Sequence, residues 1–333
     1  MKKQHPVIFI ITVLSILGIG ILYFNLQSFW NQEKYSVTVA VSKTPLSAPF
    51  YVAKFINAFD DTCVKVQYEE VMGGKTAFDK VMTGMVDFGT SSDSVIAFQS
   101  LAGQPFVTHA VFTQSDNDVK LISRASENIE SIIALKGKKI GVTKGTSSEY
   151  LLSTLLALEG LTTEDVELFD YKPEQLISAY NNNEISAIVP WEPYAFQTMQ
   201  LLDSKVKIHD TKSLNTLSFN LISQTADNQL VEKAKCVLEG ISKAINYIAS
   251  NPKKSKAIVI NALNLEPSFI DWVWPDYIFK LGLNQALLLN IKSQAIWVVE
   301  TQMSEFKEVP NSNNFIDSRA LSQVDSGAVN ITL

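Results

Sequence analysis

The first third of the chain alternates short apolar runs with stretches of helical spacing. Residues 35–41 (YSVTVAV) alternate polar and apolar positions and are rich in β-branched side chains, a pattern typical of a strand. A proline opens the next periodic stretch, which indicates the first turn of a helix. The predicted strands here cover residues 35–41, 64–71, 86–89, 105–113 and 118–123, and the predicted helices cover residues 49–59 and 76–85. This rhythm predicts α/β structure with mainly parallel sheets.

A second, shorter series of the same kind follows, without a sequence repeat of fixed period. Its predicted strands cover residues 138–142, 166–169 and 185–189, and its predicted helices cover residues 147–158 and 173–181. From about residue 229 the spacing becomes helical, and an apolar stripe from Val231 to Ile248 ends before Pro252. Two or three more helices follow to about residue 306, and the Asn- and Ser-rich tail from Val309 is expected to be a loose surface segment.

The N-terminal segment bears on the compartment. Two lysines after Met1 precede an uncharged apolar run over residues 7–24, which is 18 residues long, at the lower limit for a membrane-spanning helix. Neither a small-x-small cleavage site nor a lipobox cysteine follows this run. These features favour an uncleaved anchor in the inner membrane over a cleaved signal peptide within residues 1–34. In either case the rest of the chain is expected to be exported to the periplasm.

Composition narrows the class of protein further. The 333 residues are enough for two lobes, and the net charge of −6 with no cluster of Lys or Arg argues against a nucleic-acid partner. The two cysteines, Cys63 and Cys236, form neither a disulfide framework nor a metal-binding spacing. They could form one bridge in an oxidising compartment, but the low frequency of such single bridges favours two free buried thiols.

Two motifs that suggest catalysis do not meet its requirements. Gly73-Gly74-Lys75-Thr76 looks like a phosphate loop, but Glu69 stands where that loop needs its first glycine, so a glycine turn with Thr76 capping a helix is expected. The three histidines lie at positions 5, 109 and 209, and none is placed to serve a serine nucleophile. His109, in an apolar strand, is expected to be a hydrogen-bonded core residue. We therefore predict no enzyme activity, no metal and no cofactor.

Three segments share a different pattern, in which a strand ends and small hydroxyl or glycine residues precede a helix. They cover residues 42–50 (SKTPLSAPF), 89–94 (GTSSDS) and 143–148 (TKGTSS). Helix N-termini with hydroxyl groups bind anionic or carbonyl groups, and three at the carboxyl ends of strands predict a convergent polar site. One such segment alone would be an ordinary helix cap.

A fourth segment, Trp191-Glu192-Pro193-Tyr194, places an aromatic ring and a carboxylate at the end of the strand over residues 185–189. The alternative for this segment is a proline-initiated helix with Trp191 in the core. Two further tryptophans, Trp272 and Trp274, lie in the later helical region and are interpreted as packing residues.

With these segments in this order, the chain resembles the periplasmic solute-binding proteins of the nitrate/sulfonate/taurine transport family, which also includes thiamine-precursor binders. The resemblance runs from about residue 35 to residue 300. It rests on five segments: residues 48–54 (APFYVAK), 73–74 (GG), 84–89 (GMVDFG), 135–142 (LKGKKIGV) and 191–194 (WEPY). Each is weak alone, and together they follow the order of the family.

The resemblance implies a type II periplasmic binding protein fold, with two α/β lobes joined by two crossing strands. Lobe one would comprise residues 35–122 and 220–308, lobe two residues 123–219, and residues 309–333 would be a C-terminal tail. The ligand contacts that the matching segments imply are Leu46, Ser47, Thr90, Ser91, Ser92, Thr146, Ser147, Ser148, Trp191 and Glu192. The implied partners are a small-molecule ligand and an ABC permease. A membrane-tethered sensor on the same fold is the alternative, and enzymes of this fold depend on His and Cys clusters that the chain lacks.

Charges near these segments bear on the ligand. The possible cations are Lys43 and Lys144, and the possible acids are Asp93, Glu149 and Glu192. If the acids face the site, they repel a simple anion. We therefore expect a ligand with an amine or other donor groups, such as a zwitterion or an aminopyrimidine, rather than nitrate or a plain sulfonate.

Overall fold

The computed structural model describes residues 34–202, 205–212, 214–301, 305 and 308–332. The apolar run over residues 7–24, predicted to be an anchor or a signal peptide, lies outside these residues. None of the described helices is both long enough and apolar enough to cross a bilayer.

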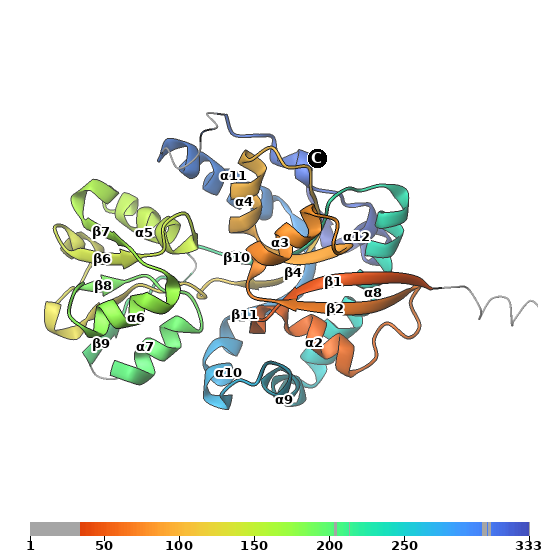
Figure 1. Ribbon diagram of the computed structural model, residues 1–333, viewed down its shortest axis with the longest axis horizontal. Coiled ribbons are helices and arrows are strands. Elements are labelled where there is room, and N and C mark those ends of the chain that lie inside the picture. The colour runs from red at the N-terminus through yellow and green to blue at the C-terminus, as the bar shows by residue number, and fades with distance from the viewer. Residues whose placement is uncertain (1–33, 203–204, 213, 302–304, 306–307, 333) are drawn as a thin grey trace, which may run out of the picture.

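The chain forms two lobes, which Figure 1 shows side by side. The larger lobe is built on a seven-stranded sheet with strand order β12-β11-β4-β10-β3-β1-β2. Its strands are β1 (Tyr35–Ser42), β2 (Val64–Val71), β3 (Phe88–Ser92), β4 (Val107–Ser115), β10 (Leu217–Ser223), β11 (Tyr277–Asn284) and β12 (Val329–Asn330). Its helices are η1 (Pro45–Ser47), α2 (Ala48–Phe55), α3 (Gly74–Met82), α4 (Asp93–Leu101), α8 (Asn228–Ser250), α9 (Pro252–Leu263), α10 (Pro267–Val273), η6 (Trp274–Asp276), α11 (Gln285–Glu300), η7 (Ser312–Phe315), α12 (Arg319–Val324) and η8 (Ser326–Ala328).

The smaller lobe is built on a five-stranded sheet with strand order β7-β6-β8-β5-β9. Its strands are β5 (Ile122–Arg124), β6 (Lys139–Val142), β7 (Glu167–Asp170), β8 (Ala187–Ile188) and β9 (Val206–Ile208). Its helices are η2 (Ala125–Glu127), η3 (Ile132–Leu135), α5 (Ser147–Leu158), η4 (Thr163–Asp165), α6 (Pro173–Asn181) and α7 (Tyr194–Leu202). Ala187 and Val189 face one apolar cluster and Ile188 faces another, which explains why this strand is apolar along its whole length.

The chain crosses between the lobes twice in the described residues. It leaves the larger sheet after β4, enters the smaller sheet at β5, and returns between β9 and β10 (Figure 1). We call residues 116–121 the first crossing segment and residues 209–216 the second. Strand β10 then runs antiparallel to both of its neighbours, β3 and β4. The α/β prediction is confirmed. Both sheets are mixed rather than mainly parallel, because β10 in the larger sheet and β5 in the smaller sheet run antiparallel to both of their neighbours, and β11 runs antiparallel to β4.

Local sequence explains the longest helix. The apolar stripe predicted from Val231 is buried, with Val237 and Ile241 fully enclosed. At the start of α8 the Asp227 carboxylate accepts a hydrogen bond from the Leu230 backbone N–H at 2.9 Å, so the first turn is capped.

The glycine turn before α3 differs from its prediction. The cap residue is Gly73, with φ of 80°, and Thr76 lies inside the helix, where its hydroxyl donates to the Met72 carbonyl at 2.8 Å. A Cβ atom at Gly74 would lie 3.1 Å from the backbone nitrogen of Ser92. The second glycine is therefore needed because α3 starts directly against the end of β3.

The segment after Val309 is not loose. The Phe315 ring stacks on the Phe106 ring with centroids 4.7 Å apart, and Leu321 is fully buried. Strand β12 pairs in parallel with β11 at one edge of the larger sheet. The few apolar residues of this segment have no helical or strand period, which is why the pattern did not reveal that they join the core.

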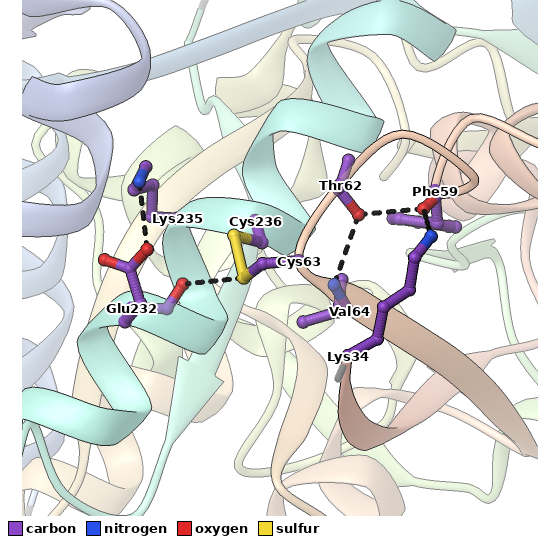
Figure 2. The surroundings of a disulfide bond; sticks show 8 residues. All are labelled: Lys34, Phe59, Thr62, Cys63, Val64, Glu232, Lys235 and Cys236. Atoms are coloured by element: carbon purple, nitrogen blue, oxygen red, sulfur yellow. Dashed lines mark hydrogen bonds and ion pairs between the residues drawn. A yellow bond between two sulfur atoms is a disulfide. The ribbon is translucent and has the colours of Figure 1, made fainter. Parts of the chain in front are cut away.

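The two cysteines form a disulfide, so the prediction of free thiols is wrong. The bond joins Cys63, just before β2, to Cys236 in α8, with the Cα atoms 5.6 Å apart (Figure 2). Beside it, Lys34 and Thr62 both donate side-chain hydrogen bonds to the Phe59 carbonyl, at 3.2 and 3.0 Å, and order the loop that carries Cys63. The pairing was hidden in the sequence because 173 positions separate the cysteines.

Candidate ligand-binding site

The first predicted segment lies after β1, which runs toward the smaller lobe (Figure 1). Leu46 is 3% exposed and packs in the core of the larger lobe. Ser47 is fully buried at the start of α2, and among the described residues its hydroxyl has no hydrogen-bond partner. An unpartnered buried hydroxyl costs roughly 1–3 kcal/mol, so this group is suited to bind a water or a ligand.

The second segment lies where β3 leads into α4. Thr90 and Ser91 are fully buried: Thr90 accepts from the Ser42 backbone N–H at 2.9 Å, and Ser91 donates to the Gly74 carbonyl at 3.2 Å. Both hold neighbouring elements together. Ser92 is half-buried and caps α4 by accepting from the Val95 N–H. Of these three residues, Ser92 is the one that is partly exposed.

Asp93 follows Ser92 and is fully buried. Its carboxylate accepts from the Ser218 hydroxyl at 3.2 Å and from the Asn290 amide at 2.5 Å. The same amide donates to the carbonyl of Thr216, at the end of the second crossing segment. Burial raises the pKa of Asp93 to about 7, against the lowering effect of its hydrogen bonds with Ser218 and with nearby backbone N–H groups. Asp93 therefore ties α4 to α11 and β10.

The third segment opens α5 in the smaller lobe. Thr146 caps the helix by accepting from the Ser148 N–H at 3.2 Å. Ser148 is fully buried and donates to the Val189 carbonyl at 2.5 Å, which joins the start of α5 to the end of β8. Ser147 is half-buried, and within the described residues its hydroxyl makes no hydrogen bond. The Thr146 hydroxyl also donates to the Thr143 carbonyl at 2.6 Å, so Ser147 carries the free hydroxyl donor of this segment.

The fourth segment divides into two roles. Trp191 is half-buried and lies edge-on to the Tyr194 ring, with centroids 6.2 Å apart. Glu192 is bound within the protein: its carboxylate pairs with Lys120 at 2.8 Å and accepts from the Trp272 indole N–H at 2.7 Å. Trp272 packs against the core of the larger lobe, as expected, and its indole N–H has this further role, which could not be assigned without the fold.

The acids expected to repel anions are not free charges. Asp93 is held by Ser218 and Asn290, Glu192 is paired with Lys120, and Glu149 is 4% exposed and accepts from the Gly145 N–H at 2.8 Å. Burial also raises the pKa of Glu149. The possible cations, Lys43 and Lys144, are both exposed. The argument for an amine-bearing ligand assumed unengaged acids, and these three are engaged inside the protein.

Aromatic side chains bring α5 against the larger lobe. The Tyr150 ring of α5 lies 5.2 Å from the Trp297 ring of α11, and Trp297 in turn lies 6.2 Å from the Phe98 ring of α4. Helices α4 and α5 are thus joined across the lobes through α11.

Asp93 gives a testable pH dependence. Between about pH 4 and pH 7 its carboxyl keeps a proton in the folded protein that the unfolded chain has lost. Stability therefore falls as the pH rises, by at most about 1.4 kcal/mol per pH unit. Asp93→Asn, which does not titrate, should lose less stability than the wild type between pH 5 and pH 7 in urea denaturation. The exposed Glu159→Gln serves as control, and equal slopes for all three proteins would contradict the prediction.

Two other features of the described residues do not coincide with the predicted site. A cavity of about 580 Å³ lies on the larger lobe between α2 and α9. Its lining residues are Tyr51, Lys54, Phe55, Glu70, Tyr247, Lys254, Ala257, Ile258, Asn261 and Ala262, and none of them was predicted. Among the described residues Cys63, Glu232 and Cys236 also lie close enough together to hold a metal ion, but the disulfide uses both sulfur atoms.

Comparisons with known proteins identify relatives of the chain. A family model described as NMT1/THI5 like matches residues 44–255. The "Putative aliphatic sulfonates-binding protein" of Bacillus subtilis strain 168 is 25% identical over 248 residues, which cover 73% of this chain and 73% of the relative.

Solved structures also resemble the chain. The periplasmic aliphatic sulphonate binding protein SsuA from Escherichia coli has a TM-score of 0.73 at 20% identity, covering 85% of this chain and 98% of that one. The alkanesulfonate-binding protein SsuA from Xanthomonas axonopodis pv. citri, bound to MOPS, has a TM-score of 0.68 at 17% identity, covering 86% and 99%. At these identities the likeness establishes the type II periplasmic binding fold.

Proposed function

The chain belongs to the NMT1/THI5-like family, and from that premise we propose that it holds a small organic anion between its two lobes and presents it to an ABC importer. The observation that carries the proposal is the unpartnered hydroxyl of Ser47, fully buried at the start of α2. Ser92 and Thr146 supply two further helix starts, one on each lobe. Helix N-termini attract negative charge, and hydroxyls there donate to oxyanions.

A sulfonate is the anion class that we favour. The acids near the site are engaged inside the protein, whereas Lys43 and Lys144 are exposed. A sulfonate offers three acceptor oxygens, which match donors arriving from several helix starts. Two similar proteins are described as sulfonate- or sulphonate-binding, which supports the same class for this chain. Delivery to an importer in the periplasm is part of the proposal, and the disulfide agrees with an oxidising compartment.

The lobes would close on the ligand as two bodies. We propose that the larger lobe, including the packed C-terminal segment, moves as one body, that the smaller lobe moves as the other, and that the two crossing segments lie between them. The boundaries expected after residues 122 and 219 shift accordingly, because Ile122 lies in β5 of the smaller sheet and residues 217–219 lie in β10 of the larger sheet. Ligand binding would shift the equilibrium toward the closed arrangement, which a permease distinguishes from the open one. A tethered sensor remains the second candidate, because no lipobox cysteine follows residues 7–24. An ABC permease that binds the ligand-loaded protein would favour transport.

Calorimetry on the full chain tests the proposed ligand class. Butanesulfonate, taurine, nitrate and an aminopyrimidine are compared in turn. We expect butanesulfonate to bind most tightly and, at 100 times its dissociation constant, to stabilise the fold by about 2.7 kcal/mol. Ser147→Ala should weaken binding about fivefold through the loss of one hydroxyl donor. Ser250→Ala, whose hydroxyl bonds within its own helix, should leave binding unchanged. Tighter binding of the aminopyrimidine, or no binding by a folded protein, would contradict the proposal.

A further inference from the structure

A buried ion pair lies where the first crossing segment meets the smaller lobe. Lys120 of that segment and Glu192 after β8 approach to 2.8 Å, and each side chain is 2% exposed. The Lys120 ammonium also donates to the Asn117 carbonyl. Charges this far from water need several bonding partners, so the elements that supply those partners are held in place around the pair.

The third partner of this pair comes from the larger lobe. The Trp272 indole N–H of α10 donates to the same Glu192 oxygen at 2.7 Å, and the Lys120 ammonium lies 5.5 Å from the Trp272 ring. Close by, the Phe196 ring of α7 packs on Phe269 at 5.3 Å and on Trp272 at 6.2 Å. Helix α10 of the larger lobe therefore contacts α7 of the smaller lobe and bonds to the residue that follows β8 of the smaller lobe.

Asp276, the last residue of η6, bonds to both crossing segments. One carboxylate oxygen accepts from the Asn117 amide of the first segment at 2.7 Å, and the other pairs with Lys212 of the second segment at 2.7 Å. Its side chain is 12% exposed. The two connections between the lobes are thus held together by one carboxylate on the larger lobe.

The same region touches the predicted ligand site. The Glu192 N–H donates to the Asp118 carbonyl at 3.1 Å, and the Lys120 N–H donates to the Pro190 carbonyl at 3.0 Å. Trp191, between these two bonds, forms an isolated bridge with Val119. A ligand that moves Trp191 would therefore also move its neighbour Glu192, which is bonded to Lys120 and Trp272.

We propose that Lys120, Glu192, Trp272 and Asp276 form a hinge clamp that sets the angle between the lobes and couples ligand contact at Trp191 to closure. Glu192 is then a positioning residue rather than a ligand contact. The part of this inference that concerns the ligand rests on the proposed function. The part that concerns the angle between the lobes rests on the contacts described above. The clamp stabilises the arrangement in which the two lobes are in contact. Weakening the clamp therefore populates arrangements with the lobes further apart, and a smaller fraction of the molecules can bind the ligand.

Trp272→Phe tests the clamp, because phenylalanine keeps an aromatic ring against Phe196 but lacks the indole N–H that donates to Glu192. Small-angle X-ray scattering of the ligand-free full chain should show a larger radius of gyration than that of the wild type. Calorimetry with butanesulfonate should show about tenfold weaker binding, as expected when the competent fraction falls tenfold. Trp274→Phe is the matched control: Trp274 also loses an indole N–H, but its ring packs on Phe279 within the larger lobe.

Asp276→Asn tests the second half of the clamp, since it removes the charge that pairs with Lys212. It should also enlarge the ligand-free radius of gyration, whereas Asp271→Asn should not, because Asp271 lies on α10 and its exposed carboxylate pairs with Lys256 of α9 within the larger lobe. If Trp272→Phe and Asp276→Asn change only the melting temperature, as their controls do, the clamp is refuted. Failure of the wild type to bind any sulfonate would refute the ligand class, while the scattering of ligand-free protein would still decide on the clamp.

Discussion

Lys120→Met is expected to lower the free energy of unfolding by about 3–5 kcal/mol, because it leaves the Glu192 carboxylate buried without its cation. The methionine side chain fills a similar volume, so the loss reports on charge rather than on a cavity. The pair is 2% exposed, so water cannot compensate for the missing ammonium. Urea denaturation followed by tryptophan fluorescence measures the difference.

Two further variants separate charge from packing. Lys120→Met combined with Glu192→Leu should recover much of the loss, because no unpaired charge then remains in the interior. Lys207→Met breaks the pair with Glu130, whose side chain is 79% exposed, and should cost less than about 1 kcal/mol. A loss at Lys120 no greater than that at Lys207 would show that the buried pair is far weaker than its geometry indicates.

Replacement of both cysteines by serine is expected to lower the free energy of unfolding by about 2–5 kcal/mol. The bond joins positions 173 residues apart, and long loops gain the most from cross-linking because the unfolded chain loses more conformational freedom. The Cys63→Ser, Cys236→Ser protein should melt at a lower temperature than the wild type in differential scanning calorimetry.

Reduction provides the control for this second prediction. Dithiothreitol should lower the melting temperature of the wild type toward that of the double-serine protein and leave the double-serine protein unchanged. If the wild type melts at the same temperature with and without reductant, although all thiols titrate as free, the cross-link contributes nothing to stability.

Local sequence signals account for much of the fold. Helices α5 and α6 have the bounds that the spacing predicted, because their caps and periodicity lie within each segment. Strands β9, β10 and β11 were missed. Strand β10 is buried at every position, so it lacks the alternation of a half-exposed strand. Strand β11 does alternate, with burial switching from residue to residue, but it directly follows a tryptophan-rich helical region and was predicted as part of that region. Their pairing with β4 is set by distant parts of the chain.

The same division applies to the candidate site. The caps Ser92 and Thr146 were predictable, since a hydroxyl before a helix bonds to residues two or three positions away. The bonding partners of the acidic side chains were not predictable. Asp93 is bonded to residues 125 and 197 positions away, and Glu192 to a tryptophan 80 positions away. Whether a carboxylate faces a ligand or a protein donor depends on such long-range contacts, which a single sequence does not contain.

The disulfide has one more consequence, which concerns peptide-bond cleavage. Cys63 precedes and Cys236 follows the whole of the smaller lobe, so that lobe and both crossing segments lie inside a covalent ring. A protease that cuts once anywhere from residue 64 to residue 235 opens the ring without releasing a fragment. The nicked protein keeps its mass on a non-reducing gel and separates into two pieces only after reduction. Limited proteolysis can therefore sever the connections between the lobes one at a time while both halves of the larger lobe stay joined.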